Sequence, residues 1–363
     1  MKINKIEIVN FRNHNNCVLT PLPNLTIITG NNGVGKTSLL ESIYYCGFGR
    51  SFRDRNELNL IKHDYNEFVI RCFIEDKDSK IHKMLVYVSK KERKFYVDDV
   101  LIKKISELNK YINILLFEPR MIDLFKSSSH QKRKDYLDLV LSKQSERYLK
   151  DLRDYKKLLA NRNELLKQEI INKVLLQAYT KQMVDISYRI DVVRSIFFKK
   201  INTVLNDISR EISNNNKRLE ISYSSIVNID DSYKKNLLKL YKDSSIEDIK
   251  SKTTNIGIHK EDYILNIDDK NIGLYGSQGE NRLGVISFVL APYFILKNDI
   301  EKPIILLDDV LSELDYLNQE RLVNFVKRLN QVFITATNTM FKEYEYQIKG
   351  ENKDEWRKSS NPK

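Results

Sequence analysis

The chain has few cysteines, and none of them are closely spaced. Cys17, Cys46 and Cys72 are the only three among 363 residues. An odd number without paired spacing fits neither a disulfide framework nor a zinc site, and it suits a reducing cytoplasm. The five histidines are scattered singly and form no HExxH motif, so we expect none of them to bind a metal ion.

Long apolar runs are also missing. No stretch approaches the roughly 20 consecutive apolar residues of a membrane-spanning helix. A hydrophobic content of 41% and a mean hydropathy of −0.46 indicate a soluble globular protein. The sequence passes directly from Met1 into an alternating strand rather than into a signal peptide. We therefore expect a cytoplasmic protein without membrane contact.

Acidic residues are fewer than basic ones. The 61 lysines and arginines exceed the 49 acidic residues, which gives a net charge of +12. This surplus favours an anionic partner, most often nucleic acid. The alternative is a lysine-rich composition spread evenly over a solvated surface.

Proline and glycine are absent from a long central region. No proline occurs between Arg120 and Ala291, and no glycine between Arg50 and Ile256. Because both residues interrupt helices, this region predicts long helices. Two of them, joined near Gln168–Lys173, would form an antiparallel hairpin. Core packing and a coiled coil are equally open for the first helix. The second favours a coiled-coil arm, because one set of its apolar residues follows a heptad pattern: Tyr179, Met183, Ile186, Ile190, Val193 and Phe197.

A phosphate-binding motif lies near the amino terminus. The pattern G-x-x-x-x-G-K-[ST] is matched by Gly30, Asn31, Asn32, Gly33, Val34, Gly35, Lys36 and Thr37, and Ser38 follows. Its glycines let backbone N–H groups wrap around phosphates, and the following helix N-terminus adds a favourable partial charge. Lys36 would reach the β- and γ-phosphates, and the Thr37 hydroxyl would bind Mg²⁺. The sequence predicts a nucleoside triphosphate site rather than a plain glycine turn.

The flanking sequence supports this motif. The run 24–29 reads as a buried strand and 38–46 as a helix. Three further strand candidates, 67–74, 82–88 and 94–98, predict an antiparallel meander attached to the nucleotide-binding sheet. The basic segment 47–53 predicts either a phosphate-facing loop or a solvated connection. The run 218–224 predicts a strand that returns to the nucleotide-binding head.

An acidic pair follows an apolar run near the other end of the chain. The run 303–307 predicts a buried parallel strand whose carboxyl end carries Asp308 and Asp309. Asp308 would hold Mg²⁺ through its water shell, and Asp309 would orient or deprotonate the attacking water. About 270 residues separate the two halves, so the head must be assembled from both ends of the chain.

Two further motifs complete the pattern. Ser277-Gln278-Gly279-Glu280 precedes a predicted helix, and Ser312-Glu313-Leu314-Asp315 follows the acidic strand. The order of phosphate loop, inserted arm, Ser-x-Gly turn and acidic strand resembles ATP-binding-cassette heads of the SMC type. The expected fold class is α/β, with a mixed sheet and helices plus an inserted helical arm. The expected segments are head 1–122, arm 123–214, head 215–349 and a disordered tail 350–363.

The motifs together resemble the RecF family from end to end. They are FRNH, GNNGVGKTS, GRSFR, GSQGENR, LLDDVLSELD, QVFITAT, GIHKED at 257–262, and the run 117–138. The resemblance implies an ATP-dependent DNA-binding protein of recombinational repair and replication. It also implies dimerisation on ATP, a DNA clamp at single-strand gaps, recombinase loading with RecR and RecO, SOS induction, and weak DNA-stimulated ATP hydrolysis.

The resemblance also implies roles for individual residues. Gly30 to Ser38 would bind ATP and Mg²⁺, Asp308 would serve the metal, and Asp309 would be the catalytic acid. Ser277 and Gly279 would touch the γ-phosphate of the other subunit, and Asp315 would line that interface. Arg12 would reach a phosphate. Glu280 departs from the glutamine usual after the turn and would place a negative charge near the partner's nucleotide.

Two other classes of function stay open. In a P-loop kinase, Asp309 would activate a small-molecule hydroxyl, although the Ser-x-Gly turn and the arm do not help to hold such an acceptor. In a structural scaffold, the coiled coil would matter and the nucleotide site would be vestigial.

Overall fold

The chain divides into two compact units. The computed structural model describes residues 1–76, 78–213, 217–295 and 302–348. The first unit comprises Met1–Met121, Glu211–Asn214 and Pro292–Lys363, and the second comprises Ile122–Arg210 and Asn215–Ala291. Residues 215–291 thus belong to the same compact unit as the inserted helices, whereas the expected segments place them with the head. The assignment of these segments to a head and an arm stays a prediction, and the expected tail lies outside the described residues.

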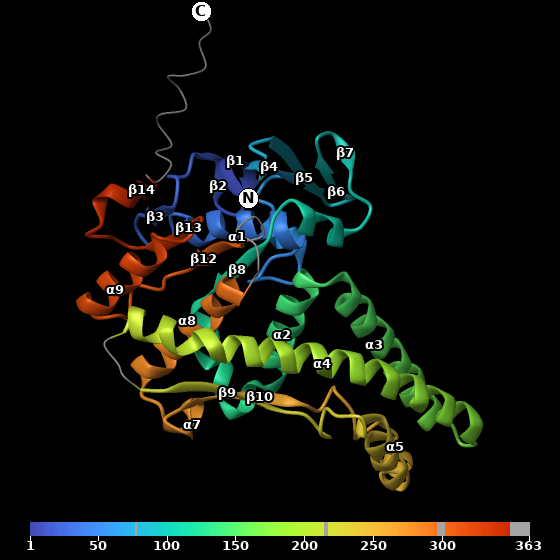
Figure 1. The fold of residues 1–363 in the computed structure, drawn as a ribbon. Coiled ribbons are helices and arrows are strands. Elements are labelled where there is room, and N and C mark those ends of the chain that lie inside the picture. The colour runs from blue at the N-terminus through green and yellow to red at the C-terminus, as the bar shows by residue number, and fades with distance from the viewer. Residues whose placement is uncertain (77, 214–216, 296–301, 349–363) are drawn as a thin grey trace, which may run out of the picture. The chain divides into compact units, whose positions relative to one another are not determined.

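The first unit contains a five-stranded parallel sheet (Figure 1). Its strands are β3 (Leu25–Thr29), β8 (Ile114–Phe117), β12 (Ile304–Leu307), β13 (Val332–Ala336) and β14 (Glu345–Gln347), in the spatial order β14-β3-β13-β12-β8. Every residue of β3, β12 and β13 is buried, which fits sequences that are apolar except for threonines in β3 and β13. Because the strands are parallel, the loops after β3, β12 and β13 emerge at one edge of the sheet.

A second, antiparallel sheet lies in the same unit. Its strands are β1 (Lys2–Phe11), β2 (His14–Leu19), β4 (Glu67–Glu75), β5 (Ile81–Ser89), β6 (Arg93–Val97) and β7 (Val100–Leu101), in the order β2-β1-β4-β5-β6-β7. The three predicted meander strands are confirmed. Their predicted attachment to the nucleotide-binding sheet is wrong, because β4 pairs with β1 instead.

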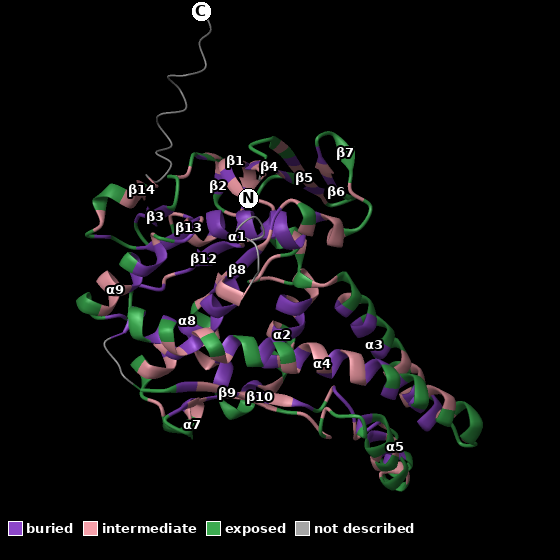
Figure 2. Cartoon of the chain, in the orientation of Figure 1, coloured by how far each residue is buried: buried purple, intermediate pink, exposed green. Residues whose placement is uncertain are grey.

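The helix after the phosphate loop explains why two sheets form. This helix, α1 (Lys36–Phe48), contacts β8 and β13 of the parallel sheet and β1 and β4 of the antiparallel sheet. Its residues from Ser38 to Phe48 are all buried (Figure 2). A helix whose residues are buried on all sides needs cover on all sides. The meander therefore covers a face of α1 that the parallel sheet leaves open.

The second unit is built on the predicted helical hairpin. Its first helices are α2 (His130–Gln144), α3 (Glu146–Leu166) and α4 (Lys173–Ile212). The connection between α3 and α4 lies where the sequence predicts it. Arg189 on α4 binds Asp151 on α3. Arg194, which comes later in α4, binds Tyr148, which comes earlier in α3. The two helices are therefore antiparallel.

A small antiparallel sheet packs in the same unit. It consists of β9 (Leu219–Ser224), β10 (Asp262–Ile267) and β11 (Lys270–Asn271), in the order β11-β10-β9. The strand predicted at 218–224 is confirmed as β9, whereas its assignment to the nucleotide-binding head stays a prediction. Asn202 and Asn206 on α4 each donate to and accept from the backbone of β9, at distances of 2.7 to 3.0 Å. These side-chain amides occupy the free edge of β9.

The sequence stretches 132–138 and 257–262 meet inside the second unit. Arg133 donates two hydrogen bonds to the carboxylate of Asp262, at 2.7 and 2.6 Å. The buried guanidinium of Arg194 contacts Asp138 at 3.0 Å and Glu261 at 3.3 Å. These motifs therefore form a buried polar network that joins α2, α4 and the segment before β10.

Further helices complete both units. The remaining α-helices are α5 (Tyr233–Asp243), α6 (Ser245–Ser251), α7 (Ile272–Tyr275), α8 (Gln278–Ile295) and α9 (Tyr316–Val326). Short 3₁₀ helices span Glu57–Leu60, Ile105–Lys110, Pro119–Phe125, Ser127–Ser129 and Lys342–Tyr344. In the described part of the chain, no helix combines the length and apolar character that crossing a membrane requires.

Candidate functional site: the phosphate loop and the acidic strand

The predicted phosphate loop joins β3 to α1. Lys36 is the first residue of α1, and its Nζ donates to the carbonyl oxygens of Gly30 (2.7 Å) and Asn31 (3.0 Å). Gly30, Gly33 and Gly35 all have positive φ values, which side-chain-bearing residues adopt at a cost. The ammonium group therefore lies inside the curve of the loop, where it would meet a phosphate once those two carbonyls release it.

The turn between β1 and β2 holds this loop in place. Asn13 Nδ2 donates to the carbonyl of Gly33 at 2.7 Å, and His14 Nε2 lies 3.1 Å from the carbonyl of Gly35. A Cβ atom at Gly35 would lie 2.2 Å from His14 Nε2, so only glycine fits there. Of the residues in this FRNH motif, only Arg12 was predicted from the sequence to have a role, and the roles of Asn13 and His14 were not. The backbone contacts they make leave no signature in a single sequence.

Arg12 binds a carboxylate on α1. Its Nε and Nη2 donate to Glu41 at 2.9 and 2.7 Å, and Glu41 is fully buried. Ser51 and Arg53, from the basic loop after α1, bind the same carboxylate. Arg12 thus ties the β1–β2 turn to α1, and its expected contact with a phosphate stays a prediction.

The acidic strand lies beside the start of α1. Asp308 Oδ1 accepts hydrogen bonds from Thr37 Oγ1 (2.9 Å) and from Thr335 Oγ1 on β13 (2.7 Å). The Thr335 hydroxyl in turn accepts the backbone N–H of Asp309 at 2.8 Å. Asp309 has a φ of +49°, in the left-handed region that costs a residue with a side chain about 1 kcal/mol or more. The structure thus brings the two remote halves of the predicted site together, and it adds Thr335, which the sequence analysis missed.

The electrostatics of Asp308 suit a cation. Burial raises the pKa of Asp308, while hydrogen bonds from Thr335 and Thr37 and the charge of Arg53 act against this rise. A bound cation would favour the charged carboxylate more strongly. The Thr37 hydroxyl and the Asp308 carboxylate are both oxygen ligands, which Mg²⁺ prefers, and Mg²⁺ takes further ligands from phosphates and water. The residues present therefore fit this ion.

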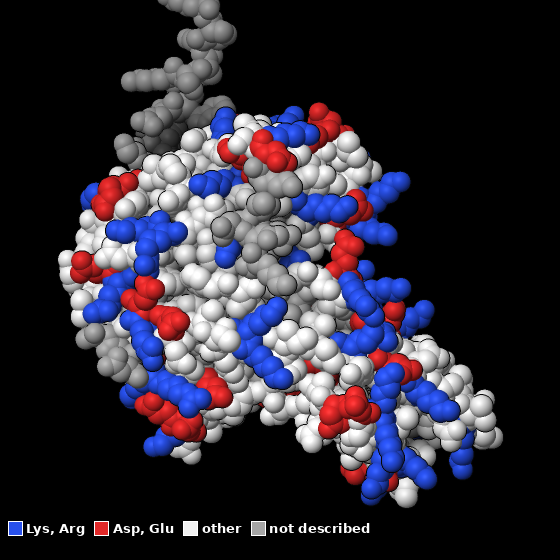
Figure 3. Space-filling view, viewed as in Figure 1, with Lys and Arg blue, Asp and Glu red and all other residues white. Residues whose placement is uncertain are grey.

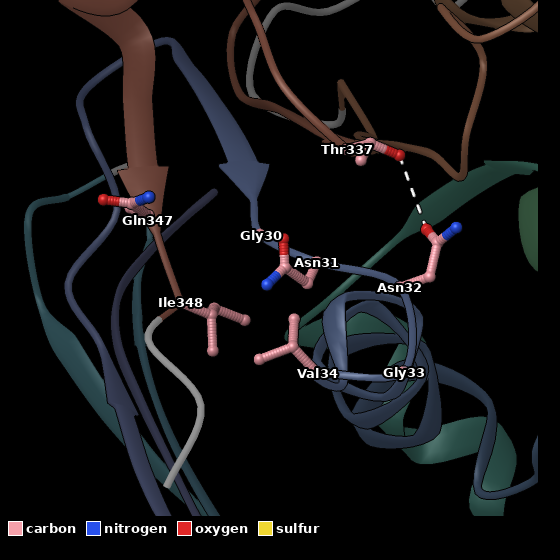
Figure 4. Close-up of a pocket in the computed structure, with 8 residues that line it drawn as sticks. All are labelled: Gly30, Asn31, Asn32, Gly33, Val34, Thr337, Gln347 and Ile348. Carbon is pink, nitrogen blue, oxygen red and sulfur yellow. Dashed lines mark hydrogen bonds between the residues drawn. The ribbon is translucent and has the colours of Figure 1, made fainter. Parts of the chain in front are cut away.

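A hollow of about 450 Å³ lies beside the phosphate loop (Figure 4). The loop residues 30–34 line it, together with Thr337, Gln347 and Ile348. Ile348 and Val34 point toward one another across it, and Thr337 Oγ1 lies 3.4 Å from Asn32 Oδ1. Gln347 and Ile348 were missed from the sequence, because their place follows from the pairing of β14 with β3.

The Ser-x-Gly turn belongs to the second unit, whereas the phosphate loop belongs to the first. Ser277 Oγ accepts the backbone N–H of Glu280 (3.3 Å), and a Glu280 oxygen accepts the backbone N–H of Ser277 (2.8 Å). This reciprocal pair is a capping box at the start of α8. Lys217 Nζ lies 2.5 Å from the other Glu280 oxygen and lowers the pKa of that carboxyl group.

The remaining predicted residues have open or structural positions. No heavy atom lies within 4 Å of a Cβ placed on Gly279, so this backbone is exposed for contact. The Asp315 side chain accepts the backbone N–H of Asn318 at 2.8 Å and caps α9 in the first unit. The proposed contacts of these residues with a second subunit stay predictions.

Comparison with known proteins gives consistent matches over nearly the whole chain. The family model described as "RecF/RecN/SMC N terminal domain" matches residues 2–356. "DNA replication and repair protein RecF" of Clostridium botulinum (strain Loch Maree / Type A3) is 35% identical over 342 residues, which is 93% of each chain. The protein of the same name from Clostridium perfringens (strain SM101 / Type A) is 32% identical over 93% of each chain.

Solved structures agree with these matches. "Structure of the recombination mediator protein RecF-ATPrS in RecFOR pathway" has a TM-score of 0.82 and 29% identity over 93% of each chain. The Smc head domain of Pyrococcus furiosus, at 15% identity and a TM-score of 0.59 over 96% of this chain and 94% of that one, shares the fold. The predicted fold, an ATP-binding-cassette head of the SMC type, is thereby confirmed. The chain belongs to the RecF family.

Proposed function

We propose that this chain is an ATP-dependent DNA clamp of replication and recombinational repair. Two copies would close around ATP, hold DNA at a single-strand gap, and release it after slow hydrolysis. The observation that carries this proposal is the contact between Thr37 and Asp308, which joins the phosphate loop to the acidic strand. The relatives whose names include DNA replication and repair, and the solved structure described as RecF-ATP, support the same function.

Nucleotide binding would rest on the loop from Gly30 to Ser38. Its N–H groups and Lys36 would hold the phosphates, and the hollow beside the loop offers room for more of the nucleotide. Thr37 and Asp308 would hold Mg²⁺, which supplies charge neutralisation at the β- and γ-phosphates. Thr335 would keep the Asp308 carboxylate turned toward Thr37.

Hydrolysis would depend on Asp309. Its carboxylate would orient or deprotonate the attacking water, with its backbone held by Thr335. The strand β13 is followed by Thr337 and Asn338, with no histidine in this position. This fits a weak ATPase, stimulated by DNA, in which hydrolysis serves as a switch.

Closure would require a second copy of the chain. Ser277, Gly279, Glu280 and Asp315 would meet the nucleotide or the interface of the partner. The Ser277 hydroxyl oxygen accepts an N–H in the capping box, so its own proton stays available for a phosphate oxygen. ATP would then add contacts only in the closed dimer and shift the equilibrium toward it.

The cellular role would follow from the partners. The similar RecF-ATPrS structure is of a recombination mediator protein in the RecFOR pathway, which supports RecR and RecO as partners here. We propose that the clamp works in the cytoplasm, promotes recombinase loading at gaps, and contributes to SOS induction.

A DNA-binding titration tests this proposal. DNA affinity should require ATP and Mg²⁺, fall steeply with salt, and show little sequence preference. The control is Lys36→Arg, because a guanidinium does not fit the place of the ammonium between Gly30 and Asn31. This variant should fold normally and lose the ATP-dependent gain in affinity. Equal DNA affinity with and without ATP would contradict the proposed coupling, and full activity of Lys36→Arg would favour the scaffold.

A further inference from the structure

One face of α5 consists of lysines. Lys235, Lys239 and Lys242 recur at spacings of four and three residues, so they lie on one side of this helix, and all three are exposed. The single acidic residue of α5, Asp243, is at its last position. In Figure 3, basic side chains gather where Figure 1 labels α5.

These three lysines have no carboxylate partner in the described ranges of the chain. The neighbouring Lys234 does have one, because its Nζ lies 2.6 Å from Asp185 Oδ1 on α4. Like charges three and four residues apart on a helix surface repel each other. A row of three therefore carries positive charge that the described residues do not neutralise.

The opposite face of α5 fixes the helix in the second unit. Tyr233, Leu237 and Tyr241 are buried on that side. The Tyr233 ring lies 5.3 Å from the ring of Tyr188 on α4, and the guanidinium of Arg162 on α3 lies 5.2 Å from the ring of Tyr241. The lysines thus project from a helix whose backbone is held in place, and a binding partner would not have to order it.

We propose that the lysine face of α5 is a contact surface for the phosphate backbone of DNA. The inference rests on the proposed DNA-clamp function and assigns part of its DNA contact to named residues. Lys235 to Lys242 spans seven residues, or about 10 Å along the helix. This corresponds to about three steps of 3.4 Å measured along the duplex axis, so the three ammonium groups are spread over enough phosphates for each to meet a different one. Lysine binds phosphate as a point charge and reads no base, which gives contact without sequence preference.

A second basic row on α3 provides a matched comparison. Lys150, Arg153 and Lys157 are also exposed and share one face of that helix. Glu146 and Glu164 occupy the same face before and after this row, at helical spacing. The Glu146 carboxylate would repel phosphates at one end of the row, whereas Glu164 at the other end is paired with Lys167 at 2.7 Å. The α3 face should therefore contribute less to DNA binding than the α5 face.

The test compares two triple variants that lose the same charge. Lys235→Gln, Lys239→Gln and Lys242→Gln are combined in one protein, and Lys150→Gln, Arg153→Gln and Lys157→Gln in the other. DNA affinity with ATP is measured between 50 and 200 mM salt. Each lost phosphate contact should reduce the slope of log affinity against log salt by about 0.9. Three lost contacts should therefore make this slope shallower by about 2.7 in the α5 variant. It should be unchanged in the α3 variant.

The outcomes separate this inference from the proposed function. Failure of the wild-type protein to bind DNA would remove the proposed function itself. Wild-type binding with an unchanged slope in the α5 variant, or an equal loss in both variants, would overturn only the α5 assignment. The α5 assignment would also be overturned if the α5 variant no longer bound anionic lipid vesicles but still bound DNA as the wild type does. If circular dichroism shows that the α5 triple variant loses helix, Lys239→Gln alone should still reduce the slope by about 0.9.

Discussion

The hydroxyl oxygen of Thr37 lies 2.9 Å from Oδ1 of Asp308, although the two residues are 271 positions apart in the chain. Thr37 is the second residue of the helix after the phosphate loop, and Asp308 directly follows the strand β12. Their contact is possible because β3 and β12 are parallel members of one sheet with their carboxyl ends at the same edge. The proposed chemistry depends on this shared edge.

Thr335→Val should slow ATP hydrolysis while leaving ATP binding within a few-fold. Valine keeps the shape of threonine and removes the hydroxyl that donates to Asp308 and accepts the N–H of Asp309. A hydrogen bond to a charged group is worth about 1.5–3 kcal/mol, so the turnover rate should fall roughly 10- to 100-fold. Steady-state phosphate release measures the rate. Thr335→Ser should restore most of it, and unchanged turnover in the valine variant would show that Thr335 does not position the acids.

Gly35→Ala should damage the phosphate loop more than Gly33→Ala. Both glycines have positive φ values, so alanine strains the backbone by about 1–2 kcal/mol at either position. Only at Gly35 would the new Cβ collide with His14 and Asn13, whereas a Cβ at Gly33 would have no described heavy atom within 4 Å beyond its own residue and its chain neighbours. Calorimetric titration with ATP should show a clear loss of affinity for Gly35→Ala. Equal affinities in the two variants would mean that the β1–β2 turn does not hold the loop.

Lys217→Ala should weaken ATP-dependent self-association. The substitution leaves the Glu280 carboxylate without its ion pair at 2.5 Å, and the proposed closure brings this negative charge toward the partner's triphosphate. Because both side chains are partly exposed, we expect a few-fold effect that shrinks as salt rises. Adding Glu280→Gln to Lys217→Ala should restore association. If the double variant associates no better than Lys217→Ala alone, the two charges do not compensate each other in the dimer.

The stability of the second unit should fall between pH 6.5 and pH 8. Burial raises the pKa of Glu261 from 4.5 to about 8, and the nearby Asp191 acts in the same direction. The folded protein then holds a proton that the unfolded chain has lost, so the favourable contribution is complete below pH 4.5 and is lost as the pH rises to about 8.

His259 acts in a different pH range. Burial lowers its pKa from 6.5 to about 4, so its neutral folded form costs stability only as the pH falls below 6.5. Thermal unfolding at pH 6.5, 7.0, 7.5 and 8.0 should therefore show a falling midpoint in the wild type and a flatter profile in Glu261→Gln. Identical profiles would show that Glu261 does not hold a proton in the folded state.

Sequence patterns located the elements of the site better than their surroundings. The phosphate loop, its helix and the acidic strand have local signatures, because glycine spacing and apolar runs follow from backbone geometry. The partners Thr335, Asn13 and His14 have none, since their contacts depend on which strands become neighbours. The same reason explains why the partner strand of the meander and the contacts of β9 were not predicted. Pairing of β4 with β1 buries a face of α1, and the edge of β9 is taken by Asn202 and Asn206. Neither the pairing of β4 with β1 nor the contacts of Asn202 and Asn206 with β9 can be predicted from one segment alone.

Glu280 shows how a departure from a family pattern can have a local explanation. The sequence predicted only that Glu280 would place a negative charge near the partner's nucleotide. In the structure it closes the capping box with Ser277 and pairs with Lys217. Lys217 is 63 residues away in the chain, so sequence spacing could not predict this pairing.

Sedimentation velocity with Mg²⁺ and ATP, ADP or no nucleotide tests the central claim most directly. The proposed closure around ATP predicts a dimer with ATP and a monomer in the other two conditions, because only the γ-phosphate would bridge the phosphate loop of one copy and Ser277 of the other. A chain that remained monomeric when saturated with ATP, Mg²⁺ and DNA together would contradict the account.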